Sequence, residues 1–199
     1  MTTDSAPINL TNHFLIAMPG LHDELFGRSV VYMCEHSQRG ALGLVINKPS
    51  DIILKHLFDK VDLPLTRKDL TDTPVFFGGP VQTDRGFVLH EAIFADADKP
   101  ADPVYASTLV IPGGLELTTS KDVLEAISIG SGPRKVLVSL GYSAWAEGQL
   151  ESELGENSWL TVAADSRLIF ETPVAQRYEH ALQLLGLESW MLSPDAGHA

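Results

Sequence analysis

The chain has 199 residues, of which 44% are apolar, and this length and composition suit one folded domain whose core needs no disulfide. The formal net charge of −12 opposes the phosphates of nucleic acid and anionic lipid, so direct nucleic-acid binding is not expected. The single cysteine and the absence of a basic and then apolar leader pattern predict a cytoplasmic protein. No apolar run approaches the roughly 20 residues that span a bilayer, so no membrane association is expected.

The first half of the chain predicts short strands separated by glycine and proline turns. Ser37-Gln38-Arg39-Gly40 divides two runs rich in Val, Leu and Ile, which is typical of a β-hairpin. Ser50 or Asp51 can cap a helix that continues to about Lys60 with its apolar residues on one stripe. Apolar runs predict strands over 13–18, 29–35, 40–47, 75–77 and 86–90.

The second half mixes strands with helices. Ser120 can cap a helix to about Ile129, and Thr172 with Pro173 predicts the start of a C-terminal helix that ends at Gly186. No repeat or linker divides the chain, which predicts a single α+β domain over residues 1–199. The remaining expectations are a helix over 144–154, strands over 104–111, 115–118, 135–140 and 158–163, an exposed loop over 96–103, and flexible ends over about 1–9 and 193–199.

Cys34 and His36 raise the question of thiol chemistry. Side chains two apart on a strand share a face, so Tyr32, Cys34 and His36 are expected on one side, with Met33 and Glu35 on the other. A thiol near an imidazole can be activated as a nucleophile. Free cysteine is also among the most buried residue types, and same-strand neighbours about 7 Å apart are too distant for a direct hydrogen bond. An inert core thiol is therefore favoured over a catalytic one.

The predicted helix over 144–154 carries a second candidate. Trp145, Gln149 and Glu153 are spaced at i, i+4 and i+8, so they would lie on one stripe of that helix. An indole, an amide and a carboxylate in line could form one wall of a recognition cleft. The alternative interpretation places Trp145 and Leu150 in the core and leaves the two polar side chains in solvent, and the sequence favours neither.

Glycine turns and histidines carry weaker signals. Gly78-Gly79-Pro80, followed by Asp84 and Arg85, could bind an anion, but a structural turn with an Asp-Arg pair is the better interpretation. The histidines show no metal-ligand spacing, and one cysteine cannot supply a thiolate cage, so no metal site is expected. The absence of dinucleotide and nucleophile-elbow motifs leaves no cofactor to predict.

Several segments together carry a family resemblance. In chain order they are HFLIAMP (13–19), SVVYMCEH (29–36), GALGLVINKP (40–49), GGPV (78–81), DRGFVLH (84–90), GYSAW (141–145), GQLE (148–151), NSWL (157–160) and GHA (197–199). In this order, and over essentially the whole chain, they resemble the bacterial YqgE/AlgH family. One departure is Ala144, where the pattern leads us to expect glycine before the tryptophan.

The resemblance implies a fold and a regulatory role, and it implies no defined enzymatic activity. It implies an α+β domain whose bent, branched and mainly antiparallel sheet closes into a pseudo-barrel with helices packed outside. The AlgH name derives from a proposed role as a transcriptional regulator of alginate synthesis. The sequence shows no helix-turn-helix and no basic face, so such a role is expected to run through a protein or small-molecule partner.

Three segments contain most of the distinctive polar and aromatic residues: the 34–36 hairpin, residues 78–90 and residues 142–159. If the sheet brings them together, they form the recognition surface of a non-enzymatic accessory or regulatory protein. The expected binding residues are Glu35, His36, Asn47, Arg85, His90, Tyr142, Trp145, Gln149 and Glu153.

Two alternatives to this binding role remain open. One is a thiol-dependent enzyme or redox sensor in which Cys34 is the nucleophile and His36 or His90 is the base. The other is a direct DNA-binding regulator, which the acidic charge disfavours.

Overall fold

The computed structural model describes residues 7–92 and 102–192. The predicted flexible tail over 193–199, the first six residues of the predicted flexible start, and most of the predicted loop over 96–103 lie outside this range. Within it, no helix is long and apolar enough to cross a membrane.

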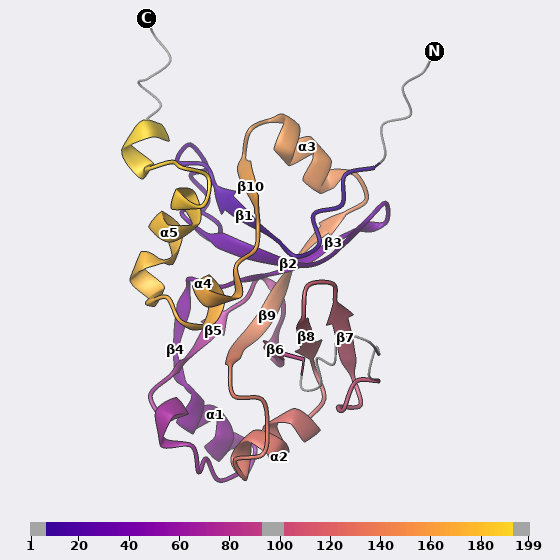
Figure 1. Ribbon diagram of the computed structural model, residues 1–199, viewed down its shortest axis with the longest axis vertical. Coiled ribbons are helices and arrows are strands. Elements are labelled where there is room, and N and C mark those ends of the chain that lie inside the picture. Colours follow the sequence, from indigo (N-terminus) through magenta and orange to yellow (C-terminus); the bar gives the residue numbers. More distant parts are fainter. Residues whose placement is uncertain (1–6, 93–101, 193–199) are drawn as a thin grey trace, which may run out of the picture.

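The described residues form one ten-stranded sheet at the centre of the molecule (Figure 1). Its main path runs β10-β1-β2-β3-β9-β6-β8-β7, and β4 and β5 join through the pairing of β5 with β9. Every pairing is antiparallel except that of β5 with β9, and the sheet curls into a half-barrel, as the predicted fold class requires. The strands are β1 (His13–Ala17), β2 (Val30–Ser37), β3 (Gly40–Val45), β4 (Pro49–Ile53), β5 (Pro74–Phe77), β6 (Val81–Glu91), β7 (Thr108–Ile111), β8 (Leu115–Thr118), β9 (Val136–Ala146) and β10 (Trp159–Ala163).

The helices are short and cover the two ends of this sheet. α1 (Leu54–Lys60) and α2 (Asp122–Ser128) lie at one end, and α3 (Gln149–Gly155) and α5 (Arg177–Gln183) at the other (Figure 1). α4 (Ser166–Phe170) connects β10 to the α5 region. Single 3₁₀ turns occupy Lys68–Leu70 (η1), Val174–Gln176 (η2) and Ser189–Leu192 (η3).

Three apolar clusters make up the core of the part of the chain that the structure describes. The largest contains Phe14, Tyr32 and Cys34 together with side chains of α4 and α5. A second cluster, on the opposite face of β1 and β2, contains Met33, Trp145 and Trp159 and is covered by α3. The third packs α1 and α2 against β5, β6 and β9. Burial of these apolar faces is the main stabilising contribution of the fold.

β9 joins the two halves of the sheet. Its first half pairs with β5 and β6, and its second half pairs with β3, with Gly141 between them at a φ of +74°. The turn at Gly78 and Gly79 crosses this point so closely that a Cβ on Gly79 would lie 2.2 Å from the carbonyl of Tyr142. Glycine is needed here for both backbone conformation and space.

The expected helix over 144–154 is wrong in its first turn. Residues 143–146 continue β9, because they pair with residues 40–43 of β3, and the helix begins only at Gln149. Tertiary strand pairing overrides the local helical pattern here. Trp145 is therefore on a strand, and the predicted helical stripe of Trp145, Gln149 and Glu153 does not exist.

Three other expectations also differ from the structure, and the first is the cap of α2, whose N-cap is Lys121 and not Ser120. Pro49–Ile53 is strand β4, so neither Ser50 nor Asp51 caps α1, and the β-branched Ile52 and Ile53 suit the strand better than a helix. The predicted helix over 172–186 is divided. Pro173 has an extended backbone, with φ −53° and ψ 138°, and only Arg177–Gln183 is α-helical; α4 had no predicted counterpart.

Candidate functional site

A groove lies where the β2-β3 hairpin packs beside the second half of β9, and residues of both line it. Glu35, Tyr142 and Trp145, all expected in the recognition surface, line this hollow of about 290 Å³. The remaining lining residues are Ser37, Arg39, Gly40, Ala41, Leu42 and Ala144. We call this hollow the hairpin groove.

A β-bulge in β2 directs Glu35 into the hairpin groove. Met33 pairs with Gly43 and Glu35 pairs with Leu42, so Cys34 is the extra residue between two consecutive partners. A bulge shifts the alternation of side chains by one position. Glu35 consequently shares the face of Leu42, while His36 pairs with Ala41 on the opposite face.

The hairpin groove combines an apolar floor with charged rims. Leu42 and Ala144 lie opposite one another on β3 and β9, and Tyr142 projects from the same face of β9. Glu35 and Arg39 are both exposed, so one carboxylate and one guanidinium border this floor. Such a surface can hold an apolar group and orient it through charge.

Glu153 organises the aromatic residues beneath the groove. Its Oε2 accepts the indole N–H of Trp145 at 2.9 Å and that of Trp159 at 2.7 Å, and its Oε1 accepts the Gln149 amide at 3.0 Å. Gln149 in turn accepts the backbone N–H of Ala146 at 3.1 Å. Trp145, Gln149 and Glu153 are thus in contact, but through a strand and a helix, and Gln149 and Glu153 stabilise the groove without lining it.

Cys34 lies inside the largest core cluster. Its side chain is 1% exposed, and its Sγ–H points to the carbonyl of Tyr32 at 3.8 Å. Burial, with a smaller contribution from Glu35, raises the pKa of this thiol far above its ordinary value. The expectation that Cys34 and His36 share a face is wrong, because the bulge places them on opposite faces of β2.

His36 is occupied on both ring nitrogens. Nδ1 accepts the backbone N–H of Leu10 at 3.0 Å, so Nε2 carries the proton and donates to Glu151 Oε1 at 2.7 Å. The ring thus links Leu10 of the N-terminal segment to Glu151 of α3. It also lines a hollow together with Pro7, Ile8 and Gln38. Its role is to hold two segments together.

His90 lies on β6, outside the hairpin groove and fully buried. Its Nδ1–H donates to the carbonyl of Glu91 at 2.8 Å, and Nε2 lies 2.8 Å from the hydroxyl of Thr118. Burial lowers the pKa of His90, although the Glu91 carbonyl and the Glu116 carboxylate oppose this shift. The ring is a neutral member of a buried hydrogen-bond network between β6 and β8.

Asn47 and Arg85 also lie outside the groove. Asn47 accepts the N–H of Val30 at 2.8 Å and donates to the carbonyl of Arg28 at 2.9 Å, which fixes the start of β2. Arg85 is exposed and lies over Phe87 at 6.0 Å, and Phe87 contacts Tyr142 edge-to-face at 5.3 Å. Arg85 therefore joins the groove only through this aromatic pair.

The sequence interpretation missed several residues of the site. Arg39 and Leu42 line the groove, and Trp159 and Glu151 complete the contacts beneath it. The position of Arg39 in the hairpin loop and the alternation along β3 were the available signals for the first two. Within the described ranges, no three His, Cys, Asp or Glu side chains gather as a metal site would require.

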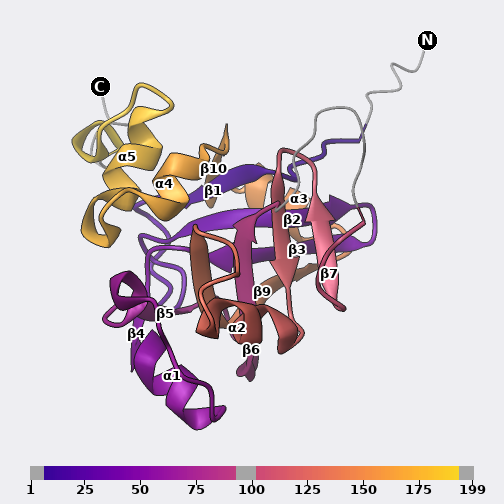
Figure 2. The ribbon, with the colours of Figure 1, turned by 60° about the horizontal axis from the view of Figure 1, so that its bottom comes forward.

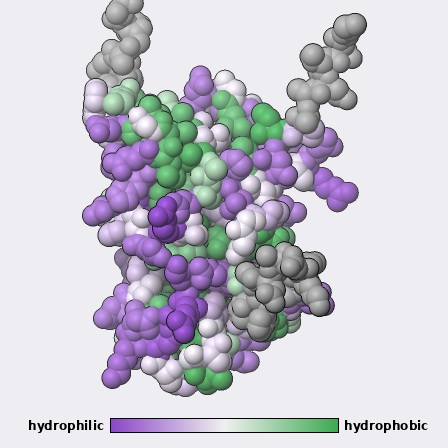
Figure 3. Space-filling view, viewed as in Figure 1, coloured by the Kyte–Doolittle hydropathy of each residue, from purple (hydrophilic) through white to green (hydrophobic). Residues whose placement is uncertain are grey.

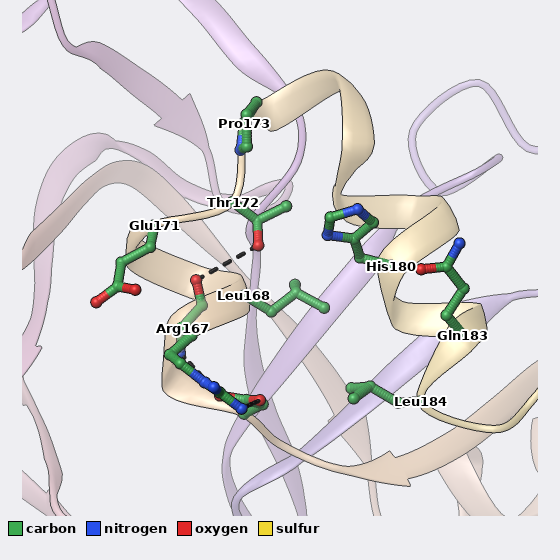
Figure 4. Close-up of a pocket in the computed structure, with 9 residues that line it drawn as sticks. Arg167, Leu168, Glu171, Thr172, Pro173, His180, Gln183 and Leu184 are labelled. Atoms are coloured by element: carbon green, nitrogen blue, oxygen red, sulfur yellow. Dashed lines mark hydrogen bonds and ion pairs between the residues drawn. The ribbon is translucent and has the colours of Figure 1, made fainter.

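A larger hollow of about 470 Å³ lies between α4 and α5. His180 of α5 and Leu184, directly after α5, project toward the side of α4 that carries Arg167 and Leu168 (Figure 4). Arg167 already pairs with Asp165 at 2.9 Å, and no expected binding residue lines this hollow.

Comparison with known proteins identifies the family. The AlgH-like family model matches residues 14–190. The chain belongs to the AlgH-like family. UPF0301 proteins of Albidiferax ferrireducens and Variovorax paradoxus are 80% and 73% identical to it, each over the full length of both chains. These matches confirm the resemblance that the sequence segments indicated.

Two solved structures share the AlgH-like fold. The AlgH protein of Pseudomonas aeruginosa is 45% identical, with a TM-score of 0.74 over 98% of each chain. A protein of Corynebacterium diphtheriae is 18% identical, with a TM-score of 0.71 over 95% of this chain and 94% of that one. The second match supports the fold alone.

Proposed function

We propose that this AlgH-like protein is a non-enzymatic, cytoplasmic accessory or regulatory protein that recognises a protein or small-molecule partner through the hairpin groove. The observation that carries the proposal is the meeting of Glu35 and Tyr142, from distant parts of the chain, in one groove. Tyrosine and arginine are enriched in recognition surfaces, and Tyr142 and Arg39 supply both.

The chemistry of the neighbouring residues supports binding over catalysis. A thiol-dependent enzyme or redox sensor needs an accessible thiolate near a base, whereas Cys34 is buried and faces away from His36. His90, the other candidate base, is itself buried in the β6–β8 network. Direct DNA binding has no support from a net charge of −12.

The test is partner capture with two groove variants. Glu35→Lys reverses a rim charge, and Tyr142→Ala removes the aromatic floor. Affinity capture from native lysate, with protein and small-molecule mass spectrometry, is expected to recover a partner with the wild type and to lose it with both variants. Thermal melts of the variants check that each remains folded.

Glu24→Lys is the matched control, because Glu24 is exposed and lies outside the hairpin groove. It makes the same change in net charge and should leave capture unchanged. Equal recovery of the same partner by the wild type and both groove variants would refute the proposal.

A further inference from the structure

β10 ends the sheet on one side, and its outer edge carries unpaired backbone groups. Among residues 7–92 and 102–192, β10 pairs with β1 and with no other strand. Two hydrogen bonds show which residues of the β10 side face β1. The Ala164 N–H donates to Asn12 O at 3.1 Å, and the Met18 N–H donates to Ser158 O at 3.0 Å. In an antiparallel pair, bonded and non-bonded positions alternate. Trp159, Thr161 and Ala163 therefore direct their N–H and C=O groups outward, where they have no hydrogen-bond partner among the described residues.

This outer edge is buried at Trp159 and becomes exposed toward Ala163. Figure 2 shows β10 at the border of the molecule, beyond β1, with α4 and α5 to one side. Ala163 is exposed and Thr161 is half-buried. The strand WLTVA contains no lysine and no proline, the residues with which proteins usually block an edge. An unblocked edge is a template for one more strand.

One face beside this edge is apolar. Leu160 and Val162 point to the face that α5 covers, where Leu187 and Leu192 pack against the same cluster. Trp190 of η3 and Leu184 are 69% and 43% exposed, and apolar side chains gather over this region of the surface (Figure 3). A strand added to β10 would place alternate side chains beside this apolar surface.

The other face beside the edge is acidic. Trp159 points toward α3, which contacts β10 and whose sequence QLESELG contains two glutamates and no basic residue. Glu156 follows directly and is exposed. The second set of alternate side chains on an added strand would therefore lie near carboxylates.

We propose that the outer edge of β10 binds an extended segment of a partner protein in which apolar and basic residues alternate. Backbone groups of Trp159, Thr161 and Ala163 bind the segment as an additional strand. The apolar residues contact the Leu184 and Trp190 side, and the lysines or arginines contact the α3 side. This surface is separate from the hairpin groove and does not depend on it.

A second copy of this chain fits the same edge less well. Twofold pairing about Thr161 sets Asn157 opposite Asp165 of the other copy and directs Glu156 of each copy toward that carboxylate, whose charge Arg167 only partly offsets. Like charges brought together oppose association, and each chain carries a net charge of −12. A basic segment meets no such repulsion.

The probe is an acetylated and amidated nine-residue peptide of alternating lysine and valine with a fluorescent label. Anisotropy titration of the full chain is expected to show saturable binding. N-methylation of three consecutive central residues blocks both backbone edges of the peptide but keeps every charge, and it should weaken binding at least tenfold. Equal binding of both peptides, or no binding of either, would overturn the proposal.

Protein variants give an independent arm of the test. Thr161→Pro removes an outward N–H without removing a bond to β1, and should also weaken binding at least tenfold; Thr161→Val is the control and should bind as the wild type does. Unchanged binding by folded Thr161→Pro would contradict the proposal.

A wild-type dimer in sedimentation that Thr161→Pro dissociates would identify a second copy as the occupant instead. If Thr161→Pro does not fold, the methylated peptide decides with the wild-type chain.

Discussion

Trp145 on β9 donates its indole N–H to Glu153 on α3 at 2.9 Å, and this bond fastens the helix to the strand that lines the hairpin groove. The same carboxylate oxygen accepts Trp159 at 2.7 Å. A single side chain thus satisfies two largely buried indoles from two different strands.

Glu153→Ala is expected to lower the free energy of unfolding by about 2–4 kcal/mol, because it leaves both indole N–H groups without this acceptor. Glu153→Gln keeps an acceptor oxygen and should cost about 1 kcal/mol. Urea denaturation followed by tryptophan fluorescence measures both. Equal stability of the alanine variant and the wild type would show that water replaces the carboxylate.

The Cys34 thiol is expected to be unreactive in the native protein, because burial raises its pKa and leaves no exposed sulfur. A chromogenic disulfide reagent at pH 8 should modify one thiol per chain only after denaturant is added. Rapid modification of the folded protein would restore the redox alternative.

The same shift in pKa predicts loss of stability at alkaline pH. Above about pH 8.5 the thiol of the unfolded chain loses its proton, while Cys34 in the native state keeps it. The free energy of unfolding should therefore fall between about pH 8.5 and 10, by up to about 1.4 kcal/mol per pH unit. Cys34→Ala should remove this part of the slope, and denaturation curves at several pH values measure the difference.

His90 predicts that the free energy of unfolding also falls at acid pH. Because burial lowers its pKa, the unfolded chain binds a proton below about pH 6.5 that the native ring does not accept. The stabilisation is present above that pH and is lost as the pH falls below it. His90→Gln can keep the bond to Thr118 that His90 Nε2 makes, and should flatten the decline between about pH 6.5 and 5. Titration of the ring by NMR gives the native pKa directly.

Gly79→Ala is expected to prevent stable folding, since its Cβ would lie 2.2 Å from the backbone of Tyr142 and its φ of +154° disfavours any side chain. Gly86→Ala, also beside β9, is the matched control, because nothing lies within 4 Å of the added Cβ. Circular dichroism and thermal melts should show a folded protein only for Gly86→Ala. A stable Gly79→Ala protein would mean that the backbone at Gly79 or Tyr142 shifts to make room for the added Cβ.

Local sequence patterns were sufficient to predict the strands with continuous apolar runs. β1, β2 and β3 could be predicted because their Val, Leu and Ile residues are buried on both faces. The second half of β9 could not, because its strand conformation depends on pairing with β3, which lies far away in the sequence. The extra residue at Cys34 has no local signature either, and it is this bulge that separates Cys34 from His36 and turns Glu35 into the groove.

The candidate site was predictable only in part for the same reason. The spacing of Trp145, Gln149 and Glu153 predicted that they lie together. They are in contact, but Trp145 lies on strand β9 and the other two lie on helix α3. His90 and Asn47 attracted notice as polar residues in conspicuous segments, and the structure assigns both to internal hydrogen bonds. A single sequence does not distinguish a polar side chain that satisfies the backbone from one that faces a ligand.

The position of β9 has a consequence for protein synthesis. β3, β5 and β6 all pair with β9, yet all three are synthesised before residues 136–146. Until then the nascent chain holds β-strands whose central neighbour does not yet exist, and such unpaired edges are prone to associate with other chains. The sheet can therefore be completed only late in translation, and its earlier strands expose unpaired edges during that interval.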